Sequence, residues 1–409
     1  MVVNLVRRDT PLDNLATYRR FVFLNLVVLA FASTQVLTGW SLLKYWKIAG
    51  TVRFMDLNSV LQSADCYQNE GLNIYSHQIG EKCAYNYGSV LIRTLNALRI
   101  GEASTFIFGL VGILVISCAL SIVELVSRKK TFSQYAFILT LFLSPPILLL
   151  MERGNVDTLI LACLILLIAL IIRGKVLLSF IVITLMTLFK FYPIVLFGLI
   201  FIKLRNRWTS LLAFGLISLV SLQILKDIAR GPGYINIFWA SFGSPIWGIY
   251  AGYIGIEIDY RLSIFLGACI FLVLLLLVNI WLKSRESSVP RERIFDSKSV
   301  ETLFTYTSTI FIFCYLLGMN FDYRLVFFLI CNLMLIFASN LNSHLITLVK
   351  VLVIPAFWFS YNLHELQPIG DLSLAFLVAI NALALIRILL NQHYDNYLVK
   401  RFGNYFTNF

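Results

Sequence analysis

Charged residues stand at the junctions between long apolar runs of this chain, and their types suit phosphate binding and proton transfer. The segment "ERGNVD" joins two such runs and holds four polar residues: Glu152, Arg153, Asn155 and Asp157. Other junctions hold Asp56, Lys190, Asp322 and Arg324. Ionisable residues near membrane depth are costly and are usually paired or functional. Each could be an ordinary interfacial cap, but a mixture of acids, bases, Asn and Tyr is typical of a polar pocket.

Asp56 is the candidate general base. It is flanked by Phe54, Met55 and Leu57, so we expect its carboxylate to lie against apolar surface. A positioned carboxylate that takes a proton from a reacting hydroxyl accelerates a reaction by about 10²–10⁴. The structural alternative is that Asp56 caps a helix, because "DLNSVLQSA" is typical of an amphipathic helix. The two roles are compatible, since a capping residue can also face a cleft.

Three cations lie at the ends of three different apolar runs and are candidates to bind a phosphate: Arg153, Lys190 and Arg324. The planar guanidinium of Arg binds phosphate oxygens in pairs, and Lys acts as a point charge. The alternative is that these cations pair with neighbouring acids, which are Glu152, Asp157 and Asp322. We expect some of both, because three acids cannot leave all three cations free.

Aromatic residues and one histidine accompany these charges. Tyr192, Tyr323 and the aromatic residues of 234–260 are candidates to stack on a sugar or to anchor the chain at the membrane interface. For any one of them the interfacial role is the commoner. His364, beside Glu365, is a second candidate for a proton or phosphate contact, although a lone interfacial His is more often structural.

A base, phosphate-binding cations and a pocket open to lipid together predict transfer of a group from a lipid-linked phosphate donor to a hydroxyl. The sequence has no P-loop and no GxGxxG motif, and it has no separate soluble domain to hold a nucleotide sugar. Two other functions compete with this one. A transporter or flippase of lipid-linked sugars would share the polar residues, but it usually has charges near the midplane and paired halves. An oligosaccharide polymerase or ligase would use similar residues and a similar outer loop.

The composition places these residues in a membrane protein. Of the 409 residues, 59% are hydrophobic and 13% are charged, and the mean hydropathy is +0.84. No water-soluble domain has this composition. A helical span needs about 20 apolar residues, and candidate spans lie at 21–43, 103–126, 132–151, 156–172, 209–226, 262–282, 302–318, 324–339, 344–361 and 370–389.

The segment 175–203 determines how many times the chain crosses the membrane. It is too long for one span and short for two, and "KFYP" at 190–193 interrupts it with a proline. Basic residues flank it at 173–175 and 203–207, and short basic loops stay cytoplasmic. We therefore expect two short spans or a re-entrant hairpin. The all-α polytopic protein would then have about 12 membrane segments, with both termini inside.

The charge distribution supports this topology. Roughly 20 of the 33 basic residues fall in the expected inner loops, against about 7 of the 21 acidic residues. The net charge of +12 therefore indicates orientation, and no nucleic-acid partner is expected. Residues 1–409 form a single integral membrane domain with two long outer loops, 44–102 and 227–261. In the first loop four apolar residues recur at helical spacing and predict an interfacial helix: Val90, Leu91, Leu95 and Leu98.

Two of the seven cysteines, Cys66 and Cys83, lie in the first outer loop. A disulfide between them is plausible in an oxidising compartment and would stabilise the fold by about 3 kcal/mol. The other cysteines fall in spans, where thiols behave as small hydrophobic groups. The sequence has no CxxC motif and no His/Cys cluster, so no metal site is expected.

Five sequence patterns together resemble the polytopic GT-C glycosyltransferases, and most closely glycosyltransferase family 87, the polyprenyl-phosphate-mannose-dependent type. They are Asp56 followed by "SAD", then "GLNIY" (71–75), "RGNVD" (153–157), "LFKFYPIVL" (188–196) and "NFDYRL" (320–325). These patterns span most of the chain. The most specific pair is "RGNVD" followed by "KFYP" one hairpin later. The segment "YNYGS" (85–89) departs from the aromatic-Pro-Pro sequence of many relatives.

The resemblance implies a GT-C bundle with outer interfacial helices and an inverting single displacement in which Asp56 is the base. It implies a polyprenyl-phosphate hexose donor, with mannose the expected sugar, and a glycan or glycolipid acceptor. The donor is a substrate, and no cofactor is expected beside it. Membrane lipids are the other expected partners. A bacterial inner membrane with the active site on its extracytoplasmic side is the implied location.

Overall fold

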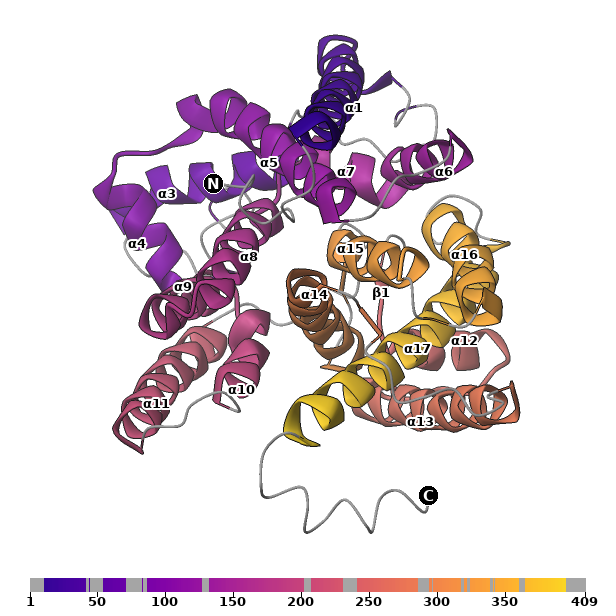
Figure 1. Ribbon diagram of the computed structural model, residues 1–409. Helices are drawn as coiled ribbons and strands as arrows, with labels where there is room; N and C mark the ends of the chain where they lie inside the picture. The colour runs from indigo at the N-terminus through magenta and orange to yellow at the C-terminus, as the bar shows by residue number, and fades with distance from the viewer. Residues whose placement is uncertain are drawn as a thin grey trace. The chain divides into compact units, whose positions relative to one another are not determined.

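The computed structural model describes residues 11–41, 44, 54–70, 83, 87–126, 132–201, 207–230, 241–285, 294–295, 297–317, 320–321, 324–338, 341, 343–359 and 365–394. Almost all of this part of the chain is helical (Figure 1). The β structure in the described residues is one antiparallel pair of two-residue strands, β1 (Ser241–Phe242) and β2 (Asn320–Phe321). The all-α class predicted from the sequence is therefore confirmed apart from this short pair.

The chain divides into two compact units. The first unit comprises Met1–Val126 and Phe142–Phe238. Its elements are α1 (Pro11–Leu37), α3 (Met55–Glu70), α4 (Ser89–Ala97), η5 (Glu102–Ser104), α5 (Thr105–Val126), α7 (Pro145–Arg153), α8 (Asp157–Ile172), α9 (Val176–Phe189), η6 (Tyr192–Val195), α10 (Leu196–Phe201) and α11 (Arg207–Arg230). Helix α5 packs against α1, α7 and α8, and α9 packs against α4, α8 and α11.

The second unit comprises Ser127–Leu141 and Trp239–Phe409. Beside the two strands it contains α6 (Phe132–Phe142), α12 (Ile246–Tyr253), α13 (Tyr260–Arg285), α14 (Lys298–Leu317), α15 (Leu325–Ile336), α16 (Ser343–Trp358) and α17 (Gln367–Tyr394). Every residue of α15 is buried, and α14, α16 and α17 pack against it. The core of this unit is therefore built around an apolar helix with no solvent- or lipid-facing side.

Long apolar helices make this a membrane protein. Within the described residues, three helices are long and apolar enough to cross a bilayer, at 102–119, 260–284 and 367–391, and the bent pair 133–142 and 145–153 raises the number to four. The exposed residues of α13 include many large apolar ones, namely Leu262, Phe265, Leu272, Val273, Leu276, Leu277 and Ile280. An exposed face of this kind suits contact with lipid. Twelve membrane segments stay a prediction.

Prolines set two helix breaks. The sequence predicts one span at 132–151, and the structure divides this segment into two helices, since α6 ends at Phe142 and α7 begins at Pro145. The reason is local: the residue before a proline avoids helical backbone, and Ser144 is extended. The break predicted within 175–203 is present, because α9 ends at Phe189 and the next turn starts two residues after Lys190.

The segment 44–102 contains two of the helices expected from the sequence, α3 and α4. Helix α4 buries Leu91 and Ile92, which form an apolar cluster with Val60 and Ala64 of α3. Leu95 packs on the same cluster. Leu98, which the sequence places on this face, is instead 63% exposed because α4 ends at Ala97.

The second loop, 227–261, begins later than expected, because α11 continues to Arg230. Helix α12 then forms within its glycine- and proline-rich part.

Candidate functional site

Four helix ends of the first unit meet at Asn155, in the turn between α7 and α8. The Nδ2 of Asn155 donates to Asp56 Oδ2 (2.6 Å) and to the hydroxyl of Tyr87 (3.2 Å). Its Oδ1 accepts from Lys190 Nζ (2.9 Å) and from the backbone N–H of Asp157 (3.0 Å). All four contacts match the donor and acceptor ends of one amide, so Asn155 fixes a carboxylate on one side and a cation on the other.

Two ion pairs flank this amide. Arg153 places one guanidinium nitrogen 3.3 Å from Asp56 Oδ1 and another 3.2 Å from Glu152 Oε2. Lys190 Nζ lies 2.7 Å from Asp157 Oδ2. Tyr192 donates from its hydroxyl to the other oxygen of Asp157 (2.5 Å). The structure therefore brings seven predicted site residues into one network, namely Asp56, Glu152, Arg153, Asn155, Asp157, Lys190 and Tyr192.

Exposure divides this network into an accessible edge and a buried base. The side chains of Asp56 and Arg153 are 21% and 17% exposed. Those of Asp157 and Glu152 are 0% and 1% exposed, and that of Lys190 is 8% exposed. An incoming molecule can therefore reach Asp56 and Arg153, whereas the buried residues hold those two in place.

Two residues with a left-handed backbone conformation precede the site residues: Phe54 before Asp56, and Gly154 before Asn155. Gly154 (φ +59°) ends α7 and turns the chain toward Asn155, a conformation that glycine adopts without a Cβ clash. Phe54 (φ +54°) precedes α3 and is 1% exposed. A left-handed backbone is rare for a bulky residue. It is held here because the Phe54 ring fills the space beside Gly109 of α5 and Gly154.

Asp56 is not the cap of α3, which corrects the structural alternative drawn from the sequence. The helix begins one residue earlier, at Met55, and Asp56 lies within its first turn. The carboxylate instead accepts from Arg153 and Asn155, which lie about a hundred positions further along the chain.

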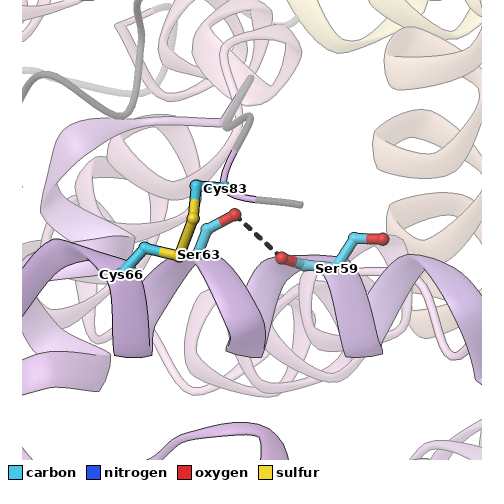
Figure 2. Close-up of a disulfide and its surroundings, with 4 residues drawn as sticks. All are labelled: Ser59, Ser63, Cys66 and Cys83. Carbon is cyan, nitrogen blue, oxygen red and sulfur yellow. Dashed lines mark hydrogen bonds between the residues drawn. A yellow bond between two sulfur atoms is a disulfide. The ribbon is translucent and has the colours of Figure 1, made fainter. Parts of the chain in front are cut away.

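The predicted disulfide between Cys66 and Cys83 is present, with 5.9 Å between the two Cα atoms (Figure 2). Cys66, the end of the bridge in α3, lies one helical turn after Ser63. The hydroxyl of Ser63 donates to the backbone oxygen of Ser59 (2.8 Å). The bridge ties α3, which carries Asp56, to the chain just before Tyr87. The ring centroid of Tyr87 lies 5.1 Å from Lys190 Nζ, a cation–π distance. Tyr87 is a site residue that the sequence analysis missed.

A second polar contact, also missed, holds the start of α4, two residues after Tyr87. Asp227 of α11 accepts from the backbone N–H of Ser89 (2.9 Å) and from its hydroxyl (3.0 Å). Gln223 donates to both partners. A carboxylate at the first turn of a helix stabilises it, so α11 anchors the start of α4. Ser89 and Asp227 are 138 positions apart in the chain, and neither belongs to a local motif that would have shown the pairing.

The other predicted site residues belong to the second unit. Arg324 is the residue before α15, and it is partly exposed. Asp322, Tyr323 and His364 lie outside the residues that the structure describes. Among the described residues no three His, Cys, Asp or Glu side chains are grouped so that they could hold a metal ion.

Comparison of the chain with family models, with curated proteins and with solved structures gave no significant match. The resemblance to glycosyltransferase family 87 therefore stays a prediction. Any functional interpretation of the Asp56–Arg153 pair depends on its geometry.

Proposed function

We propose that this protein is a membrane glycosyltransferase that moves a hexose from a polyprenyl-phosphate donor to a hydroxyl of a lipid- or glycan-linked acceptor. The observation that carries the proposal is the accessible Asp56–Arg153 pair held by a buried network. A carboxylate and a guanidinium side by side provide a proton acceptor and a phosphate ligand, which are the two groups this transfer needs.

The proposed reaction is a single displacement with inversion at the anomeric carbon. The acceptor hydroxyl forms a new bond to that carbon while the bond from the carbon to the phosphate oxygen breaks. Asp56 takes the hydroxyl proton. Arg153 stabilises the negative charge that collects on the departing polyprenyl phosphate, an electrostatic role that is strongest where water is excluded.

Burial assigns different roles to the other charges. Asp157 is fully buried and bonds to Lys190 and Tyr192, so it is poorly placed to replace Asp56 as the base. Lys190 contacts both Asp157 and Asn155. We therefore assign Lys190 the role of orienting Asn155, in place of direct phosphate binding. We also propose the GT-C arrangement with about 12 membrane segments and an extracytoplasmic site, and the disulfide supports an oxidising side for α3.

The test is transfer by the purified protein in lipid nanodiscs. Radiolabelled polyprenyl-phosphate mannose is supplied with a lipid extract as acceptor, and labelled products are separated by chromatography. We expect Asp56→Asn to lower the rate by about 10²–10⁴. The control is Asp65→Asn in the same helix, because an amide oxygen can still accept from the backbone N–H of Glu102 as Asp65 does. Full turnover by the Asp56 variant would refute the assigned base.

A flippase for lipid-linked sugars is the second candidate, and the helix break at Lys190 favours it. Discontinuous helices with polar residues at the break form the binding sites of many transporters. An assay of the same purified protein, reconstituted into sealed vesicles, distinguishes the two functions. A flippase moves the labelled donor across the bilayer with its sugar still attached, whereas the proposed transferase changes its covalent structure.

A further inference from the structure

The residue after Tyr87 holds this tyrosine against the end of α9. The backbone N–H of Gly88 donates to the carbonyl of Phe189 (3.3 Å). A Cβ at Gly88 would overlap the carbonyl oxygen of Leu188, so the two segments can approach this closely only because residue 88 is a glycine. Lys190 follows Phe189 directly. The approach therefore brings the ring of Tyr87 to the ammonium of Lys190, which lies 5.1 Å from the ring centroid.

The contacts of Tyr87 involve both ends of the Asn155 amide. The hydroxyl of Tyr87 accepts one of the two hydrogens on Asn155 Nδ2 (3.2 Å), and Asp56 Oδ2 accepts the other (2.6 Å). The ring of Tyr87 faces Lys190, whose ammonium donates to Asn155 Oδ1 (2.9 Å). Asn155 is 1% exposed. These neighbouring side chains, and not bulk water, therefore satisfy its amide.

The orientation of this amide determines which atom faces the carboxylate of Asp56. In the structure a donor faces the carboxylate and an acceptor faces the ammonium of Lys190. Turning the amide over would place its oxygen against the carboxylate and its hydrogens against the ammonium, and both contacts would be repulsive. Without the hydroxyl of Tyr87, one of the two contacts that hold Nδ2 in place would be lost. The hydroxyl therefore acts on Asp56 through Asn155.

We propose that Tyr87 is a positioning residue of the hexosyl transfer, whose hydroxyl holds Asn155 Nδ2 on Asp56 and so keeps the base oriented toward the acceptor hydroxyl. The inference rests on the proposed function, because it is a reaction with Asp56 as base that needs this orientation. The ring has a separate, structural role, since it packs against the apolar cluster of α3 and α4. A substitution that removes the hydroxyl and keeps the ring separates the two roles.

Tyr87→Phe is that substitution, because it retains the packing of the ring and its contact with Lys190. In the nanodisc transfer assay we expect kcat to fall by about tenfold, as for a hydrogen bond whose buried donor is left without a partner. The KM for the donor should change by less than about twofold, because the orientation of the base matters in the transition state. Tyr67→Phe is the matched control, because Tyr67 of α3 packs against the same cluster and is not a partner of Asn155. It should turn over like the wild type.

A double variant shows whether the effect passes through Asn155. Asn155→Ala removes the donor that Asp56 and Tyr87 share, so adding Tyr87→Phe to it should lower kcat no further. A hydroxyl with a structural role alone would lower thermal stability and leave kcat unchanged. Each kcat is therefore calculated for the folded fraction, which size-exclusion chromatography measures.

Three results would overturn the positioning role: a wild-type kcat for Tyr87→Phe, a loss confined to KM, or losses that multiply in the double variant. The first of these, in a wild-type protein that transfers the sugar, refutes the role of Tyr87 and leaves the proposed function intact. A wild-type protein that transfers no sugar refutes the proposed function, and the role of Tyr87 with it.

Discussion

Replacing Lys190 by Met tests whether the buried half of the network supports the accessible half. The ammonium of Lys190 lies 2.7 Å from Asp157, and the two side chains are 8% and 0% exposed. Breaking a buried ion pair by removing one partner destabilises a protein by about 3–5 kcal/mol. The Arg153–Asp56 pair is more exposed, so breaking it by neutralising Asp56 should cost only about 0–1 kcal/mol. Removing Arg153 would not isolate this pair, because Arg153 also pairs with the buried Glu152.

The contrast between these two values is the prediction. Lys190→Met should lower the free energy of unfolding by at least about 2 kcal/mol more than Asp56→Asn does. The double variant Lys190→Met with Asp157→Asn should recover part of the loss, because the buried charge is removed and Tyr192 can still donate to the amide oxygen. A positive coupling of about 1–3 kcal/mol between the two positions is expected.

Reversible unfolding in mixed micelles, followed by circular dichroism during an SDS titration, gives the free energies. Labelling of Cys163 with a thiol-reactive dye provides a local readout, because Cys163 lies in α8 with Asp157. Equal losses for the Lys190 and Asp56 variants would refute the division into a buried base and an accessible edge. So would a double variant that is no more stable than the single Lys190 variant.

Three further perturbations test how the site is built. Reduction of the Cys66–Cys83 disulfide should lower stability by about 3 kcal/mol and slow transfer, as thermal unfolding and transfer assays with and without reductant will show. Gly109→Ala should destabilise the protein by about 1–3 kcal/mol through overlap with the neighbouring aromatic ring, whereas Gly112→Ala in the same helix meets only ordinary contacts and should be neutral or stabilising in the same SDS titration. Asp227→Ala should cost about 1–3 kcal/mol and increase hydrogen exchange at the start of α4, which an unchanged exchange pattern would contradict.

Local sequence features predicted much of the fold. Apolar runs located most helices, since helix length in a bilayer follows from the count of apolar residues. The proline after Lys190 marked a true helix break. The pair Pro145–Pro146 carries the same signal, and the predicted span at 132–151 overlooked it. The spacing of Cys66 and Cys83 within one loop was enough to predict their bridge.

Contacts between distant segments could not be read from the sequence. The partnership of Asp227 with Ser89 depends on how α11 packs beside α9, and no local pattern encodes that packing. The antiparallel pairing of residues 241–242 with 320–321 is equally invisible, because two-residue strands have no periodicity. Asp371 is different: a carboxylate inside the predicted span 370–389 was a visible signal of a buried polar contact, which the Tyr250 hydroxyl makes.

The order of the network along the chain has a consequence for biosynthesis. Its members, from Asp56 to Tyr192, all come from the part of the polypeptide that leaves the ribosome first. Chains emerge at about 5–20 residues per second and tend to fold from the N-terminus. The charged side chains can thus neutralise one another before the strongly apolar helices α13 to α17 are translated. A nascent chain stalled after α11 would carry a paired set of charges into the bilayer instead of isolated ones.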